Sequence, residues 1–193
     1  IDVMVLSHAH IDHSGLIPLL VKEGYRGKIF CTPATKDLTG VLLEDSAGIQ
    51  ESDVRYINKK RAADGQPYIE PLYTTDDAKK ATEHLELVNY NEWRTIAEGV
   101  ELCFTDAGHI IGSACVHLRI TENGKKEQLT FSGDVGRYRD VILRSPDVFS
   151  QADYIILEST YGNKLHEMQV TTPDQLLAWI ERTCLQKKGK LII

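Results

Sequence analysis

The sequence predicts an α/β fold built as a layered sandwich, in which helices cover the outside of mixed β-sheets. Two observations support this prediction: helix-like and strand-like segments alternate at both ends of the chain, and a run of short apolar segments lies between them. Alternating segments favour parallel pairing, whereas consecutive short strands favour antiparallel pairing. With 193 residues, 42% of them hydrophobic, the chain is long enough to bury a core. We therefore expect one domain over residues 1–193.

The first half of the chain is expected to alternate between strands and helices. Its predicted elements are a buried strand at 1–6, a helix at 12–23, a strand at 28–31, one or two helices at 34–63, and a helix at 75–84. Gly24 should end the first helix, and Pro18 is tolerated near its first turn. A break in the long helical segment is expected near Gly48. Thr74 or Thr75 could cap the last helix.

From residue 85 the pattern changes to short strands, followed by a final helix. The expected strands cover 85–90, 100–105, 114–120, 128–132 and 154–157, and the last of them reads as buried. Glu122-Asn-Gly-Lys125 predicts a hairpin turn, since Asn-Gly favours the backbone angles of tight hairpins. Residues 172–188 predict an amphipathic helix that Gly189 ends, and residues 190–193 look like the start of another strand.

Composition and charge bear on the class of protein. No apolar stretch approaches the roughly 20 residues that a membrane-spanning helix requires, so no membrane partner is expected. The four cysteines are scattered without a C-x-x-C pair, which indicates reduced thiols and a cytoplasmic location. The net charge of -6 argues against non-specific adhesion to nucleic acid but leaves a nucleic-acid substrate open. Unpaired strand edges would favour a homo-oligomer.

The segment His8-Ala-His-Ile-Asp-His13 is the feature that points most directly to chemistry. It places four residues able to ligate a metal within six positions, directly after the first strand. Imidazole and carboxylate together suit zinc or a similar divalent ion. His8 and His10 point the same way in an extended loop, so they can bind one ion. Asp12 and His13 are adjacent and diverge, which suits a second ion.

Three further candidates follow apolar strands in the same way as His8. They are His109, Asp134 and Glu158, each just past a predicted strand. Side chains at the ends of neighbouring strands converge, which is how sheet-based enzymes build their sites. The glycines at 108, 112, 133 and 136 would let these loops pack closely around ions. Taken singly, each candidate is an ordinary turn residue; together with His8–His13 they form a coherent set.

Taken together, these motifs resemble those of a known family. H-x-H-x-D-H, a later Gly-His and a later Gly-Asp follow the ligand order of the metallo-β-lactamase superfamily. The segments Asp106-Ala-Gly-His-Ile-Ile-Gly-Ser113 and Glu158-Ser-Thr-Tyr-Gly162 are similar to its β-CASP branch of RNA-processing nucleases, and residues 42–50 resemble the bacterial members. The resemblance covers nearly the whole chain. It implies the metallo-β-lactamase fold, a four-layer αββα sandwich with a two-zinc centre at its edge.

The resemblance also implies a role for each candidate residue. The metal ligands would be divided between two Zn²⁺ ions: His8, His10 and His109 on one, Asp12 and His13 on the other, with Asp134 bridging both. Glu158 matches an acidic motif that supports a histidine near the leaving group. That histidine, a further ligand of the second zinc and the β-CASP cap domain are expected outside residues 1–193. The chain is thus expected to be an incomplete N-terminal core, truncated at both ends, in which one Zn²⁺ or none could bind.

The leading hypothesis is a zinc-dependent ribonuclease. A hydroxide shared by two metal ions would attack a phosphodiester bond of RNA, fixed by Asp12 and Asp134 and supported by Glu158. Whether cleavage is endo- or exonucleolytic stays open, and so does a DNA substrate. The alternatives are a metallo-β-lactamase-fold hydrolase of a small ester, thioester or lactam, a non-catalytic scaffold, and a fragment that is inactive in isolation.

The remaining histidines and the basic residues favour structural roles. His166 could protonate a leaving oxygen, although an exposed or structural role is favoured. His84 is expected on the surface, and His117 is expected to be packed within a strand. Arg137 and Arg139 would either steer a phosphate or form salt bridges. The short basic runs are expected on solvated helix faces.

Overall fold

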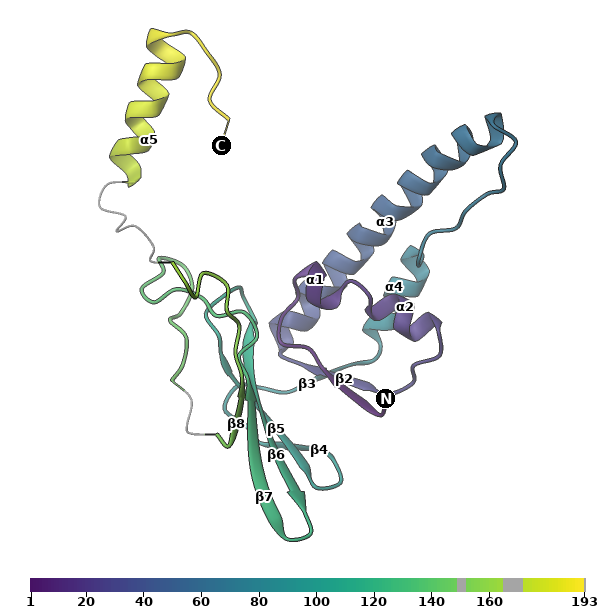
Figure 1. Ribbon diagram of the computed structural model, residues 1–193, viewed down its shortest axis with the longest axis vertical. Helices are drawn as coiled ribbons and strands as arrows, with labels where there is room; N and C mark the ends of the chain where they lie inside the picture. The colour runs from purple at the N-terminus through teal and green to yellow at the C-terminus, as the bar shows by residue number, and fades with distance from the viewer. Residues whose placement is uncertain (149–151, 165–171, 193) are drawn as a thin grey trace. The chain divides into compact units, whose positions relative to one another are not determined.

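The computed structural model describes residues 1–148, 152–164 and 172–192. The chain divides into two compact units, Ile1–Glu158 and Ser159–Ile193. The first unit contains both β-sheets and helices α1 to α4, and the second contains the last helix (Figure 1). All the metal ligands predicted from the sequence lie in the first unit, so the architecture of that unit determines how they meet.

A three-stranded parallel sheet forms in the first part of the chain. Its strands, in spatial order, are β1 (Val3–Val5), β2 (Lys28–Cys31) and β3 (Leu85–Leu87). Met4 pairs with Ile29, and Ile29 pairs with Leu85, so one row of apolar residues crosses all three strands. The strands predicted near residues 1–6 and at 28–31 are confirmed.

Two short helices replace the single helix predicted at 12–23. They are α1 (Ile11–Ser14) and α2 (Ile17–Lys22), separated by Gly15 and Leu16. Pro18 explains the division, because it has no N–H to donate and occupies the first turn of α2 instead of a helix interior. Gly24 ends α2 as predicted, with a φ of 109°.

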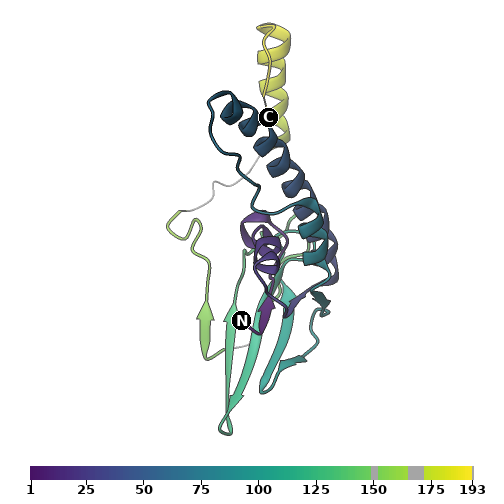
Figure 2. The same ribbon diagram turned by 90° about the vertical axis from the view of Figure 1, so that its right-hand side faces the viewer.

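A 31-residue helix, α3 (Pro33–Ala63), follows β2 and extends beyond α4 (Figures 1 and 2). The hydroxyl of Thr32 caps it by accepting the Thr35 N–H. The break predicted near Gly48 is wrong, and the helix continues through it. One glycine costs a helix only about 1 kcal/mol, which the packing of its neighbour Ala47 against Tyr73 can offset.

The chain then returns along α3 and enters α4 (Thr75–Thr82) (Figure 1). The side chain of Asn58 on α3 fixes this return, because its amide both donates to Ile69 O and accepts from Ile69 N–H. Thr74 caps α4 in a reciprocal capping box with Asp77, so the predicted helix start is confirmed.

The second sheet has five strands and contains the predicted antiparallel run. They are β4 (Arg94–Ala97), β5 (Val100–Asp106), β6 (Ala114–Glu122), β7 (Lys125–Phe131) and β8 (Tyr154–Ile156), in that order across the sheet. All neighbours are antiparallel except β8, which pairs parallel to β7. The hairpin between β6 and β7 turns at Asn123 and Gly124, both with positive φ, as predicted. The sequence analysis missed β4, a short and mostly exposed strand.

The core of the first unit has three layers. Helices α2 and α4 pack on one face of the three-stranded sheet, through a cluster that includes Val21, Ile29 and Ala81. The other face packs against the five-stranded sheet, where Phe30 meets Phe104. The layered α/β sandwich is therefore confirmed as a helix layer and two sheets. A second helix layer, which a four-layer sandwich requires, is not found among the described residues of this unit.

The last strand of the five-stranded sheet differs from the prediction in its burial. The segment 154–157 was expected to be a buried strand because it is continuously apolar. The structure confirms the strand, but Tyr154, Ile155 and Ile156 are each 54% exposed. The apolar pattern predicted the conformation correctly and the burial wrongly, because burial also requires a layer packed on the strand.

The second unit consists of one helical segment and its flanks. α5 (Thr172–Ile180) continues as a π-helix over Glu181–Gln186, so the last part of the predicted α-helix has wider turns. Residues 187–192 form no strand, which corrects the strand start expected at 190–193 for the residues described. Within the described chain, no helix combines the length and apolar character that a membrane span needs. The four cysteines are free thiols, as predicted.

Candidate metal centre

The first two histidines lie on the loop that follows β1. Its start is fixed by two backbone hydrogen bonds, from Leu6 N–H to Phe30 O and from Ala114 N–H to Ser7 O, which tie it to both sheets. Helix α1 fixes its end, because the Ser14 hydroxyl contacts the carbonyl oxygens of residues 9 and 10. His8 is therefore buried between the sheets, while His10 stands at the start of α1 and is half-buried.

His109 lies on the loop between β5 and β6, and several contacts hold this loop. The hydroxyl of Ser113 accepts the N–H groups of His109 and Ile110. On the far side, the buried hydroxyls of Thr32 and Thr35 both donate to Gly112 O, at 2.7 and 2.8 Å. These bonds join the beginning of α3 to the loop, so His109 is positioned by residues almost 80 positions away in the sequence.

Asp134 follows β7 on a loop that touches the His109 loop backbone to backbone. A Cβ atom built on Gly136 would lie only 1.6 Å from Gly108 O, so no other residue fits there without moving one of the loops. The Gly136 N–H also donates to Ala107 O. The sequence prediction that glycines let these loops pack closely is confirmed at this contact.

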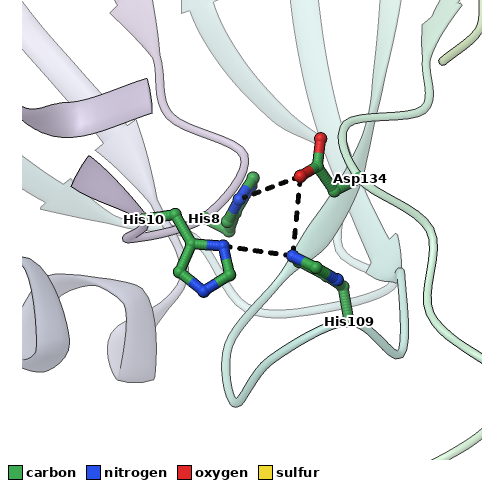
Figure 3. Close-up of side chains that lie close together, drawn as sticks. All are labelled: His8, His10, His109 and Asp134. Carbon is green, nitrogen blue, oxygen red and sulfur yellow. Dashed lines mark hydrogen bonds and ion pairs between the residues drawn. The ribbon is translucent and has the colours of Figure 1, made fainter. Parts of the chain in front are cut away.

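Four side chains from these three loops come together (Figure 3). One ligand atom from each of His8, His10, His109 and Asp134 lies within 4.8 Å of the others. His10 Nδ1 is 3.1 Å from His109 Nε2, and Asp134 Oδ2 is 3.5 Å from His109 Nε2 and 3.7 Å from His8 Nε2. Ligand atoms at about 2.0–2.1 Å from a tetrahedral zinc would be roughly 3.3–3.4 Å apart. These three distances bracket that value, so the three pairs have the spacing of ligands on one zinc ion.

The Nε2 atom of His8 provides an independent test of this fit. It is buried and makes no hydrogen bond within the described part of the chain. A buried polar atom without a partner is costly, and it usually marks an unseen ion or water. On its other side, Nδ1 of the same ring is 3.1 Å from the hydroxyl of Ser7. An Nδ1–H that donates to Ser7 would leave the Nε2 lone pair directed at the cluster, as a metal ligand requires.

Burial also sets the protonation of this ring. Desolvation, reinforced by the neighbouring His13 ring, lowers the pKa of His8 to about 4, although Asp134 acts in the opposite direction. The imidazole is therefore neutral at pH 7. A neutral imidazole is the form that binds a metal ion.

Asp12 and His13, predicted to hold a second ion, lie at the edge of this cluster. His13 Nε2 is 3.5 Å from Asp134 Oδ1 and 3.6 Å from Asp12 Oδ2. The two oxygens of Asp134 thus face different groups: Oδ2 faces His8 and His109, and Oδ1 faces His13. The Asp12 side chain is 75% exposed, so this second group is far more open than the first.

Glu158 lies outside the cluster and contacts the loop that carries Asp134. Its Oε1 accepts the Val135 N–H at 2.8 Å, and its own N–H donates to the Ser132 hydroxyl. The structure therefore brings Glu158 to residues on both sides of Asp134, to the backbone of Val135 and to the side chain of Ser132.

Comparison with known proteins extends this picture across the whole chain. Ribonuclease TTHA0252 of Thermus thermophilus is 33% identical over 193 residues, which are 100% of this chain and 39% of the ribonuclease. Transcription termination factor FttA of Methanosarcina mazei is 34% identical over 196 residues, covering 100% of this chain and 28% of the factor. Both similarities run through all three ligand loops. The chain belongs to the β-CASP branch of the metallo-β-lactamase superfamily.

This β-CASP chain spans about two fifths of the ribonuclease and less than one third of the termination factor. No protein-family model matches it. Among solved structures, the subclass B3 metallo-β-lactamase MEM-A1, from a soil metagenome library, has a TM-score of 0.40 and 16% sequence identity, over 68% of this chain and 41% of its own.

The other candidates in the β-CASP chain do not join the cluster. His84 contacts Gly27 O through Nδ1, and His117 is buried in β6 between the hydroxyls of Thr105 and Thr130. His166 lies outside the described residues. Arg137 and Arg139 are exposed, and neither forms a salt bridge to a described residue, although the charge of Arg137 contributes to lowering the pKa of Asp140.

The sequence analysis missed the residues that position the ligands. Ser7, Ser113, Thr32 and Thr35 are small polar residues in ordinary turns or at a helix cap, and nothing in their local pattern predicts a contact with a ligand loop. Only the capping role of Thr32, directly before Pro33, has a sequence signal.

Proposed function

We propose that this chain is the metal-binding part of a zinc-dependent ribonuclease that hydrolyses phosphodiester bonds in RNA. The observation that supports the metal site most directly is His8 Nε2, a buried ligand atom that makes no hydrogen bond to a described residue and lies beside three other ligand side chains. The names of the two relatives, a ribonuclease and a transcription termination factor, support RNA as the substrate. No specific observation favours the alternative of a small ester, thioester or lactam.

The ligands would be divided between two metal ions as the family resemblance implies. His8, His10 and His109 would hold one ion, Asp12 and His13 a second, and Asp134 would contribute one carboxylate oxygen to each. Bound zinc ions supply water of lowered pKa and neutralise the charge that develops on a phosphate oxygen. The open second group gives a substrate access from the side of Asp12.

Glu158 would act as a positioning residue. Its carboxylate accepts the Val135 N–H, and its backbone N–H donates to the Ser132 hydroxyl. These two residues flank the Gly133–Asp134 segment. Its effect on the reaction would then pass through the orientation of Asp134, whose two oxygens must face two groups at once. This role does not require Glu158 to contact the scissile bond.

The remaining predictions concern the whole protein. RNA is the proposed substrate, and endonucleolytic or exonucleolytic cleavage, a DNA substrate, a cytoplasmic location and a homo-oligomer stay predictions. The same holds for the division of the protein into this core and a β-CASP cap domain.

Metal content tests the site first. Zinc is measured by elemental analysis in the purified chain, in His10→Ala, and in His84→Ala as the control histidine outside the cluster. We expect at least about one equivalent of zinc in the chain and in His84→Ala. His10→Ala should bind zinc more than about 100-fold more weakly, because a direct ligand contributes more than the 10–100-fold of outer-shell partners. Equal zinc in both variants would contradict the ligand assignment.

Hydrolysis is then assayed with the zinc-loaded chain on RNA and DNA oligonucleotides, a thioester and a β-lactam reporter. Cleavage of RNA that EDTA abolishes is the expected result. Hydrolysis of the thioester or lactam with intact RNA would favour the alternative hydrolase. Zinc binding without any hydrolysis would leave the metal site in place and reject nuclease activity of this chain alone.

A further inference from the structure

A pocket of about 470 Å³ lies beside the loop that presents His109. Its volume falls within the roughly 300–1,000 Å³ of small-ligand sites. None of the four clustered ligands lines it, so it is distinct from the metal centre. The lining residues that decide its chemistry are Asn89, Tyr90, Asp106, Ile110, Ile111 and Arg144.

The pocket shares a wall with the metal centre. Gly108 and Ile110 line it on either side of His109, and adjacent Cα atoms are about 3.8 Å apart. The Tyr90 hydroxyl donates to Ser113 O at 2.8 Å, and the Ser113 hydroxyl accepts the His109 N–H. A molecule in the pocket would therefore rest on the loop whose conformation also sets the position of His109.

The lining combines apolar surface with donors and acceptors. Ile110 and Ile111 supply aliphatic side chains, and Tyr90 supplies a ring that its hydroxyl hydrogen bond holds in place. Arg144 is a cationic donor, Asp106 is an anionic acceptor, and the Asn89 amide can do both. A nucleobase has the complementary character, a flat apolar face with donors and acceptors along its edge.

A phosphate or a sugar fits this lining less well. A phosphate group only accepts hydrogen bonds, and the negative charge of Asp106 offsets the positive charge of Arg144, so the lining offers a phosphate no net attraction. A ribose has no flat apolar face to cover the two isoleucines. The mixture of charges and apolar atoms thus favours the base among the three parts of a nucleotide.

We propose that this pocket binds one base of the RNA strand whose phosphate lies at the metal centre. The proposal rests on the ribonuclease function, because it assigns the pocket to the same substrate. The Asp106 carboxylate accepts hydrogen bonds, so bases with an exocyclic amino group, such as adenine, bind better than uracil.

The pocket is tested without metal, by NMR of the isoleucine δ1-methyl groups in the EDTA-treated chain. The probes are AMP, UMP, ribose 5-phosphate and inorganic phosphate. AMP should shift the methyl signals of the pocket residues Ile110, Ile111 and Ile142, and UMP should bind more weakly. Ribose 5-phosphate and phosphate should leave these signals unchanged.

A matched pair of variants separates the pocket from the general surface. Ile111 is 61% exposed at the pocket, and Ile49 is 55% exposed on α3, away from it. Ile111→Asp should weaken AMP binding by about fivefold or more, the equivalent of one lost apolar contact. Ile49→Asp should leave it unchanged. Since both side chains are exposed, both variants should fold, which thermal unfolding checks.

Three results would overturn the proposal: no shift of the pocket methyls with AMP, equal shifts with AMP and ribose 5-phosphate, or equal weakening by the two variants. Zinc binding is measured on the same samples. If zinc binds and AMP does not, the pocket proposal fails while the metal site stands. If AMP binds the pocket and zinc does not bind the cluster, the ribonuclease proposal fails while base recognition stands.

Discussion

The five-stranded sheet has two regions that differ sharply although their sequences are alike. At β5 and β6, apolar residues such as Leu102 and Val116 are buried, and the loop between these two strands carries His109. At β8, the equally apolar Ile155 and Ile156 are 54% exposed, and the strand pairs only with β7. The first region is packed on a second sheet, whereas no described residue of this unit covers the second.

This difference bears on where the site gets its rigidity. The ligand loops are held by hydrogen bonds between backbone groups and from short hydroxyl side chains. Glu158, in contrast, lies two residues after the end of the exposed strand β8. The proposed metal ligands therefore stand on the stable region, and the positioning residue Glu158 stands on the less stable one.

The largest effect is expected at the contact between the two ligand loops. Gly136→Ala places a Cβ 1.6 Å from Gly108 O, so the loops of His109 and Asp134 must move apart. Zinc affinity should fall more than about 100-fold, because two ligands lose their relative position. Competition titration with a zinc chelator measures this change.

Gly48→Ala is the matched control for this substitution. A Cβ on Gly48 meets nothing within 4 Å, in the interior of α3. Zinc affinity should stay unchanged, and stability should rise by about 0.5–1 kcal/mol because alanine is the better helix former. Loss of zinc in both variants would show that the loop contact has no special role.

The packing difference between the two regions predicts unequal costs of truncation. Leu102→Ala should lower the free energy of unfolding by about 2–5 kcal/mol, because the side chain is fully buried. Ile156→Ala should change it by less than about 0.5 kcal/mol, because its side chain is mostly exposed. Urea unfolding of both variants gives the comparison. A cost for Ile156→Ala as large as that for Leu102→Ala would mean that β8 is covered in solution.

A smaller effect is expected at the hydroxyls that hold the His109 loop. Thr35→Val removes one donor to Gly112 O and should cost about 1–3 kcal/mol of stability, together with a loss of zinc affinity. Thr35→Ser keeps the hydroxyl, so its zinc affinity should be closer to that of the unchanged chain than its stability is. If serine and valine lower zinc affinity equally, the hydrogen bond does not position the loop.

The sequence predicted the ligand set because its signals are local. His8, His10, Asp12 and His13 are close in sequence, while His109 and Asp134 each follow a strand that its apolar residues reveal. The resemblance to a family then assigned these residues to one site. Their convergence in the structure agrees with that assignment.

The misses share one physical cause, which is dependence on a distant partner. The exposure of β8 depends on which layer covers it, and the contact of Thr32 and Thr35 with Gly112 joins segments far apart in the chain. Gly48 failed to break α3 because tertiary packing outweighs the preference of one residue. Local patterns therefore predicted the helices and strands better than the contacts between them.

The smallest expected effect concerns His117, on the same sheet but away from the metal centre. Burial lowers its pKa below the usual 6.5, and two threonine hydroxyls contact its ring. Below about pH 6.5 the unfolded chain binds a proton at His117 that the folded chain does not bind. The contribution of His117 to the free energy of unfolding is therefore fully present above that pH and is lost as the pH falls through the folded-state pKa. One such proton contributes a slope of at most about 1.4 kcal/mol per pH unit.

His117→Gln isolates this contribution. The variant is less stable at pH 7, because the amide replaces only part of the contacts to Thr105 and Thr130. Its stability should nevertheless depend less on pH below about 6.5, since the titrating group is gone. Urea unfolding of both metal-free proteins across this range measures the two slopes. Because His8 is retained in both, its own low pKa cancels in the difference. Equal pH slopes in the two proteins would mean that His117 binds its proton as readily in the folded chain as in the unfolded chain. The packing around His117 in β6 should prevent this.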